Sequence, residues 1–145
     1  MSLRTLIEST PLGSTLLVSN GEPRPPERFH RKLSNWNCQN YTGTLVSIET
    51  GPGQRPAFVV RQGSMEDTAP IVLQTRYSFD TSLRFEVQRR PTPGSARVVR
   101  ASRRELLHVA ANYGEAVKWL ADNLISDALI KVVTEADEEI AEDAA

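Results

Sequence analysis

The sequence predicts an α+β fold: an antiparallel β-meander or small, partly open barrel of five to six strands, then two C-terminal helices and an acidic tail. Short apolar runs bounded by Gly, Pro, Asp or Ser recur roughly every dozen residues, which favours antiparallel strands. Apolar residues after position 104 follow helical spacing. We expect one domain over residues 1–133 and a tail over 134–145, because the last twelve residues are too acidic to bury much surface.

The first forty residues predict a short helix, a strand and a long irregular segment. "LRTLIES" (3–9) has helical spacing, and "STLLVS" (14–19) reads as a strand. Prolines in "NGEPRPPE" (20–27) then interrupt regular structure, because they fix φ and lack an amide donor. From Glu27 we expect one or two helical turns followed by a polar loop up to Tyr41.

Five β runs form the centre of the predicted sheet. The segment "LRFEVQR" alternates most regularly, with Leu83, Phe85 and Val87 on one face and polar residues on the other. A half-buried strand requires this period of two. The five runs cover residues 41–49, 57–62, 71–77, 83–89 and 96–101.

The C-terminal third predicts two helices. Ser102 and Glu105 match a capping box before "LLHVAA", and Gly114 is expected to end that helix in a left-handed conformation. A second helix should follow to residue 133, with a wide apolar face that needs covering. This face, a candidate surface for a partner protein or a homodimer, contains Val117, Leu120, Leu124, Ala128 and Val132.

Composition narrows the class of protein. No apolar run approaches the roughly 20 residues needed to span a bilayer, and the first residues do not resemble a signal peptide. A single cysteine, Cys38, excludes an internal disulfide and agrees with a reducing compartment. We therefore expect a cytoplasmic protein that does not associate with membranes.

Charge is divided unevenly along the chain. Residues 1–104 hold fifteen basic and eight acidic residues, a net charge of +7, whereas residues 105–145 hold two lysines and ten acids, a net charge of −8. Fourteen of the seventeen bases are arginine, which suits bidentate contacts with phosphate. A GC-rich genome produces the same arginine bias without any function, so a purely compositional origin carries about equal weight.

The sequence offers little for catalysis. It contains two histidines, His30 and His108, and one cysteine, and none of the common metal, nucleotide or nucleophile motifs. The adjacent acids Glu66 and Asp67 fit a solvated turn better than an acid–base pair. We expect a protein that is not an enzyme, with no cofactor and no metal ion, although scattered carboxylates in an unrecognised active site would look the same.

The arginine-rich segment 84–104 favours binding to single-stranded DNA or RNA. A hairpin around "RPTPGS" would bring the arginines of two strands to one face, and single-strand binders combine such cations with stacking rings. The acidic tail would then compete with phosphates for the same face, and a role as a solubilising terminus alone carries about equal weight. The expected interface comprises Arg84, Arg89, Arg90, Arg97 and Arg100 for phosphates, with Trp36 and Tyr41 offered for stacking. For both rings, a place in the core or a role in anchoring a loop is slightly favoured over stacking.

The alternative function comes from another class of protein. The apolar face of residues 117–133 is also expected in an adaptor, a chaperone or an inhibitor that docks on a partner protein through it. A homodimer formed through that face is compatible with either function.

Overall fold

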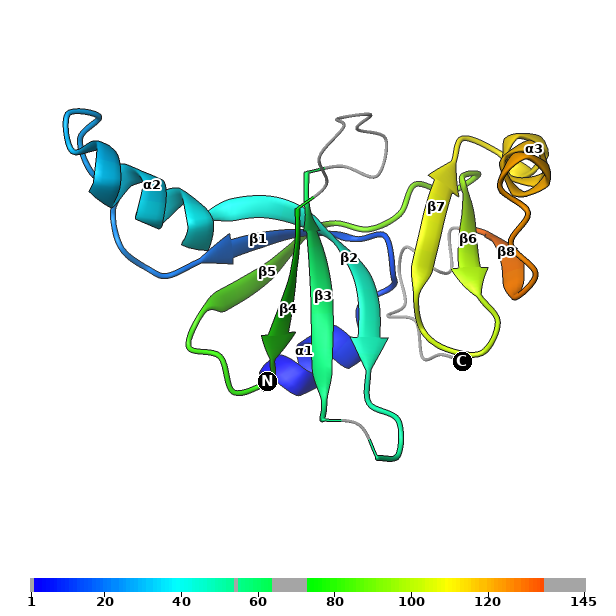
Figure 1. The fold of residues 1–145 in the computed structure, drawn as a ribbon, viewed down its shortest axis with the longest axis horizontal. Coiled ribbons are helices and arrows are strands. Elements are labelled where there is room, and N and C mark those ends of the chain that lie inside the picture. The colour runs from blue at the N-terminus through cyan, green and yellow to red at the C-terminus, as the bar shows by residue number, and fades with distance from the viewer. Residues whose placement is uncertain (1, 54, 64–72, 135–145) are drawn as a thin grey trace.

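The computed structural model describes residues 2–53, 55–63 and 73–134, which form two open antiparallel sheets with three helices (Figure 1). The expected α+β class and the antiparallel sheet are confirmed, but no barrel closes. The five-stranded sheet has the order β4-β3-β2-β1-β5. Its strands are β1 (Thr15–Ser19), β2 (Tyr41–Glu49), β3 (Ala57–Gln62), β4 (Gln74–Ser78) and β5 (Arg84–Arg89).

A three-stranded sheet of order β7-β6-β8 follows, and the helix α3 (Tyr113–Asn123) packs on it. Its strands are β6 (Ala96–Arg100), β7 (Leu106–Ala110) and β8 (Ala128–Val132). The expected hairpin of residues 83–101 is therefore wrong, because β5 is an edge of the first sheet and β6 is the centre of the second. "RPTPGS" is the crossover between the two sheets.

Of the two expected C-terminal helices, the first is wrong and the second is present but shorter than expected. "LLHVA" forms β7, and the helix expected up to residue 133 ends at Asn123, after which Leu124 has a φ of 50° and the chain turns into β8. The apolar run 106–110 faces a sheet core on one side and α3 on the other. A strand covered on both faces gives an apolar run that periodicity does not separate from a buried helix.

The expected capping box does not cap a helix. The Ser102 hydroxyl donates to the Asp127 carboxylate at 2.6 Å, while the Glu105 carboxylate pairs with Arg100 and Arg103. The N-cap of α3 is instead Asn112, whose side chain accepts from the Glu115 amide.

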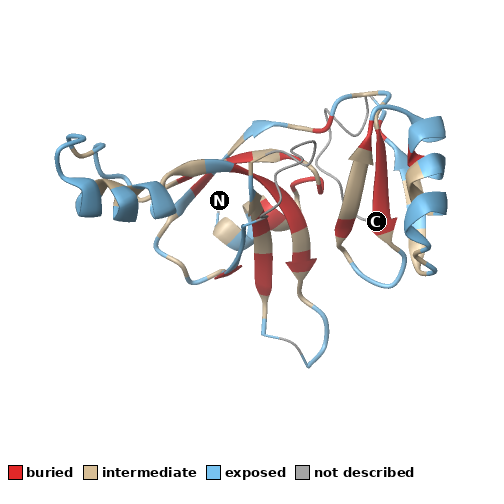
Figure 2. Ribbon diagram, turned by 45° about the horizontal axis from the view of Figure 1, so that its top comes forward, coloured by how far each residue is buried: buried red, intermediate tan, exposed pale blue. Residues whose placement is uncertain are grey.

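Helices α1 and α2 differ in how much of their surface is covered (Figure 2). Helix α1 (Leu3–Glu8) inserts Ile7 into the main core beside the five-stranded sheet. Helix α2 (His30–Gln39) is longer than expected and has no buried residue. It is anchored at one end of β1, where the side chains of Asn20 and Gln39 form a hydrogen bond of 3.0 Å.

The two sheets share a core. Val99 of β6 and Leu106 of β7 pack in the same cluster as the β2 and β3 residues Leu45 and Phe58. The amide of Ile48 in β2 also donates to the Arg104 carbonyl at 3.0 Å, just before β7. These contacts bring β2 close to β7, and the candidate site lies at this junction.

Candidate nucleic-acid interface

The structure distributes the five expected arginines over two sheets. Arg84 and Arg89 lie at the two ends of the edge strand β5, and Arg90 begins the crossover. Arg97 and Arg100 lie on β6 in the other sheet. The five side chains therefore form separate groups.

A polar row crosses the five-stranded sheet on the face opposite the main core. Strand register places Arg89 opposite Thr15, Thr15 opposite Thr44, Thr44 opposite Arg61, and Arg61 opposite Gln74. Residues directly opposite one another in an antiparallel sheet point to the same face. The row thus carries two threonines between two arginines, and its Arg89 end adjoins the second sheet.

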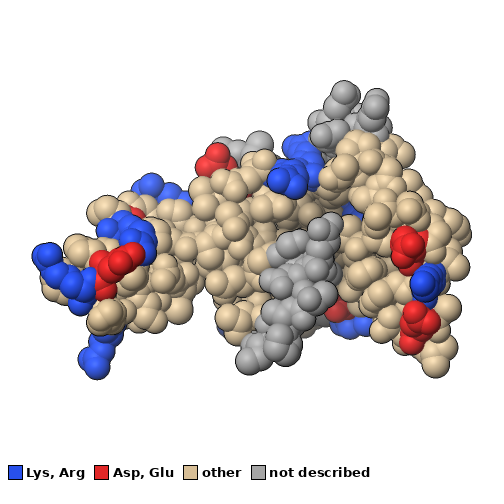
Figure 3. Space-filling model, turned by 90° about the horizontal axis from the view of Figure 1, so that it is seen from above, with Lys and Arg blue, Asp and Glu red and all other residues tan. Residues whose placement is uncertain are grey.

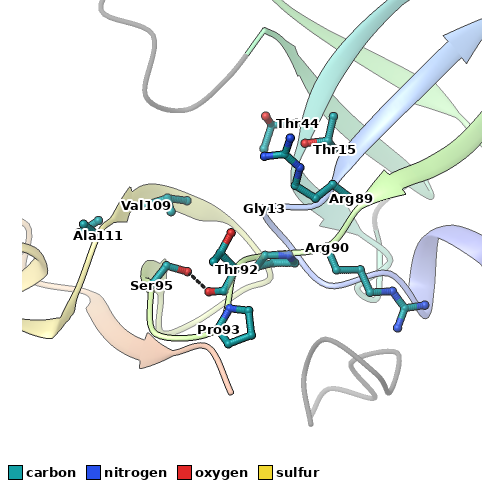
Figure 4. Close-up of a pocket in the computed structure, with 12 residues that line it drawn as sticks. Gly13, Thr15, Thr44, Arg89, Arg90, Thr92, Pro93, Ser95, Val109 and Ala111 are labelled. Atoms are coloured by element: carbon teal, nitrogen blue, oxygen red, sulfur yellow. Dashed lines mark hydrogen bonds between the residues drawn. The ribbon is translucent and has the colours of Figure 1, made fainter. Parts of the chain in front are cut away.

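A pocket of about 330 Å³ lies where this row meets β7, and we call it the inter-sheet pocket (Figure 4). The side chain of Arg89 lies beside Thr15 and Thr44, while Arg90 extends in another direction. The pocket is lined by Gly13, Thr15, Thr44, Arg89, Arg90, Pro91, Thr92, Pro93, Ser95, Val109, Ala110 and Ala111.

The lining chemistry of the inter-sheet pocket suits an anion. The described lining residues include two arginines and four hydroxyl side chains but no Asp or Glu. The Thr44 hydroxyl donates to the Gly63 carbonyl at 2.9 Å, and that of Ser95 donates to the Thr92 carbonyl at 2.5 Å. Two of the four hydroxyl groups thus bind backbone carbonyls, and the two arginines supply the positive charge of the pocket. Guanidinium groups recognise phosphate oxygens in a bidentate manner.

Arg97 and Arg100 make structural contacts. Arg97 is only 4% exposed, and its Nη1 donates to the Leu12 carbonyl at 3.1 Å, which connects β6 to the loop before β1. The Nε of Arg100 is 2.8 Å from Oε1 of Glu105. Neither residue lines the inter-sheet pocket.

The two expected stacking rings also lie away from the inter-sheet pocket. Trp36 of α2 is half-buried, and its indole N–H donates to the Glu22 carbonyl at 2.9 Å. Tyr41 packs against the main core, and its hydroxyl forms a short hydrogen bond with that of Tyr77. Burial, followed by this hydrogen bond, raises the pKa of Tyr41 well above its ordinary range. Both side chains therefore make contacts that stabilise the fold.

A further group of cations lies at the free end of α2, where Figure 3 shows Lys and Arg side chains with acidic side chains among them. Arg28 lies over the Phe29 ring at 4.8 Å from its centroid, and Lys32 lies over it at 5.2 Å. The ring is therefore already in contact with cations of its own segment, although it is 41% exposed. Cys38, near the other end of α2, is exposed as well.

The expected apolar partner face is divided between α3 and β8. Leu120 and Ala128 pack against the core of the three-stranded sheet. Val117 is 44% exposed, Leu124 87% and Val132 45%. Of these exposed residues, Val132 lies on β8, which is an edge strand.

His108 of β7 lies in an aromatic stack. Its ring is 4.6 Å from that of Trp119 and nearly parallel to it. Burial lowers the pKa of His108 below its ordinary value, and the positive charge of Arg61 lowers it further. Within the described residues, no group of three or more His, Cys, Asp or Glu side chains is placed to hold a metal ion.

The expectations for the acidic turn and the acidic tail concern residues outside the described structure. Glu66, Asp67 and the acidic residues 135–145 lie outside the described part of the chain. Over the residues that the structure describes, no helix is both long and apolar enough to cross a membrane.

Sequence reasoning missed Thr15, Thr44 and Arg61 as members of the candidate site. All three are polar positions inside strands with apolar neighbours, the pattern of a side chain on the outer face of a sheet. That pattern indicates on which face of the sheet each side chain lies. Their alignment in one row depends on strand order and register, which one sequence does not supply.

One comparison with known proteins gives a match. A family model described as "Uncharacterised conserved protein UCP036055" matches residues 1–138. The comparison with curated proteins gives no match. The comparison with solved structures gives none either.

Proposed function

The chain belongs to this family of uncharacterised conserved proteins, and we propose that it is a non-enzymatic accessory protein that binds single-stranded nucleic acid. The observation that carries the proposal is the inter-sheet pocket, which is lined by Arg89, Arg90 and four hydroxyl side chains, with no acidic side chain among the described lining residues. The phosphate backbone supplies most of the affinity in sequence-independent binding, so such a pocket favours backbone contacts.

The edge strand β5 supports an extended path for the backbone. Arg84 and Arg89 mark its two ends, about 17 Å apart at the rise of an antiparallel strand. Arg90, the next residue along the chain, is also among the residues that line the inter-sheet pocket. Glu86 interrupts the path midway, so we expect phosphates to be held at the two ends of β5. This path replaces the stacking contacts that Trp36 and Tyr41 were expected to make.

The test is the affinity of the full chain for a fluorescent oligothymidylate at about 50 mM salt. The double variant Arg89→Gln/Arg90→Gln should bind at least tenfold more weakly, since a hydrogen bond to a charged group contributes about 1.5–3 kcal/mol. Arg55→Gln is the matched control, because Arg55 is an exposed arginine in the β2–β3 connection that does not line the inter-sheet pocket. It should bind within twofold of the wild type.

Two results would contradict the proposal. One is wild-type protein that does not retain the oligonucleotide at low salt. The other is an equal loss of affinity in the double variant and in Arg55→Gln, which would indicate attraction by the charge of the whole molecule.

A second candidate function is protein docking, and we propose a second copy of this chain as the occupant. Among the strands that the structure describes, β8 is an edge. The Asp127 carbonyl accepts a hydrogen bond from the Ala101 amide, and the Val133 amide donates to the Ser95 carbonyl. The odd-numbered residues of β8 therefore direct their backbone groups toward β6. The backbone groups of Ala128, Ile130 and Val132 therefore point outward, as on any unpaired strand edge.

Charge complementarity favours the second copy. If two β8 strands pair antiparallel about Leu129, Asp127 of each copy lies opposite Lys131 of the other. Opposite charges facing each other across strands contribute about 0.2–1 kcal/mol per pair. Leu129, which is 50% exposed, would meet its own counterpart at the two-fold axis.

The oligomeric state measured by sedimentation tests this docking. We expect a dimer that Val132→Lys converts to a monomer, because a charged side chain then lies at the paired edge. Val117→Lys is the control, since Val117 is equally exposed but lies on α3, and this variant should remain dimeric. A monomeric wild type, or a dimer disrupted by Val117→Lys alone, would refute pairing through β8.

A further inference from the structure

A second cluster of cations lies on the opposite side of β6 from α3, and we call it the cationic pocket. It has a volume of about 210 Å³ and combines residues of β6, the β6–β7 loop and β8. None of the described residues that line it is acidic. Its five cations are Arg97, Arg100, Arg103, Arg104 and Lys131.

Contacts with the fold hold these guanidinium groups in place. The Nε atoms of Arg100 and Arg103 lie 2.8 and 3.0 Å from the same Glu105 oxygen. Arg104 donates to the Glu8 carbonyl at 3.0 Å. One carboxylate thus serves two arginines, and a neutral carbonyl accepts from a third, so these contacts leave an excess of positive charge around the pocket.

Burial strengthens the electrostatic effect of this excess positive charge. Arg97 is 4% exposed, and Arg100 and Arg104 are half-buried, so solvent screens their charges less than it screens those of surface residues. Lys131 and Arg103 remain exposed at the rim. This arrangement of fixed cations with an open rim is suited to a compact anion that carries several charges.

We propose that the cationic pocket is a binding site for a small phosphate-bearing anion, distinct from the inter-sheet pocket. Guanidinium forks match the geometry of phosphoryl oxygens, and the resulting hydrogen bonds are charge-assisted. The two pockets share none of their described lining residues. The proposal therefore holds whether or not the chain binds nucleic acid.

Calorimetric titration of the full chain with pyrophosphate tests the proposal. We expect one saturable site per chain, weakened at least tenfold by Lys131→Gln and by Arg103→Gln. These two residues are exposed, so both variants should keep the wild-type unfolding temperature. Lys118→Gln is the matched control, because Lys118 is an exposed lysine on α3 that does not line the pocket. It should leave the pyrophosphate affinity unchanged.

The Arg89→Gln/Arg90→Gln variant separates the two sites. It should retain full affinity for pyrophosphate, even if its affinity for the oligonucleotide falls. The inference is overturned if the wild type does not bind pyrophosphate, or if Lys118→Gln weakens binding as much as Lys131→Gln does. Loss of pyrophosphate binding in the double variant would also overturn it, because the anion would then occupy the inter-sheet pocket.

Discussion

Arginines that look alike in the sequence have different roles once their burial is known. Arg97 is buried and donates to the Leu12 carbonyl, whereas Arg89, only eight positions earlier, is exposed at the inter-sheet pocket. Composition suggested one function for both. Exposure separates them: Arg89 keeps N–H groups at the surface where a ligand can contact them, whereas Arg97 contributes mainly its charge to the cationic pocket.

At the same scale, His108 should make stability depend on pH. Its pKa is lowered in the folded state by burial and by Arg61, so the unfolded chain binds the proton more readily. Stability is therefore fully present above the unfolded pKa of about 6.5 and decreases as the pH falls below it. We expect the urea concentration at the unfolding midpoint to decrease as the pH is lowered from about 7.5 to about 5.5. The decrease should be smaller in the His108→Gln variant.

The control compares how steeply the stability of the wild type and of His108→Gln changes with pH, because carboxylates also titrate at low pH. Both proteins should lose some stability below about pH 5, but only the wild type should show the extra loss around pH 6. Identical pH profiles for the two proteins would contradict the lowered pKa.

At the scale of elements, alternation predicted the first sheet well. Strand β5 was expected from the period-two pattern of Leu83, Phe85 and Val87, and Phe85 is indeed buried. Strand β7 was expected as a helix, because "LLHVA" is mostly apolar and follows a capping-box match. Local pattern specifies which residues are buried, whereas pairing with β6 decides that the segment is extended.

The close packing of β2 against β3 gives an element-scale prediction. A Cβ at Gly43 would lie 2.6 Å from Cγ1 of Val60 and 2.7 Å from the Arg61 carbonyl oxygen. The strands must separate to admit it, so Gly43→Ala should lower the free energy of unfolding by about 3 kcal/mol, measured by urea denaturation.

Gly114→Ala is the comparison for that variant. Gly114 lies in the first turn of α3, and its nearest contact would be the Asn112 Oδ1 at 3.4 Å. Alanine has a better helix propensity than glycine by about 1 kcal/mol, so this variant should be as stable as the wild type or more so. Equal effects of the two substitutions would argue against close contact at Gly43.

At the scale of the whole molecule, the arginine-rich first part of the chain divides into two pockets and a basic helix end. The sequence predicted the excess of positive charge, but it did not predict that Arg89 and Arg97 lie in different pockets. Its assumption of a β5–β6 hairpin failed because the crossover "RPTPGS" passes from one sheet to the other. Sheet order is a property of the tertiary fold, and no local turn signal reports it.

The salt dependence of oligonucleotide binding tests the central claim most directly. The logarithm of the association constant should fall linearly with the logarithm of salt concentration, by about 0.7 for each phosphate neutralised on a single strand. If Arg89 and Arg90 each neutralise one phosphate, the slope of Arg89→Gln/Arg90→Gln should be shallower than that of the wild type by about 1.4. An unchanged slope in that variant would contradict phosphate binding at the inter-sheet pocket.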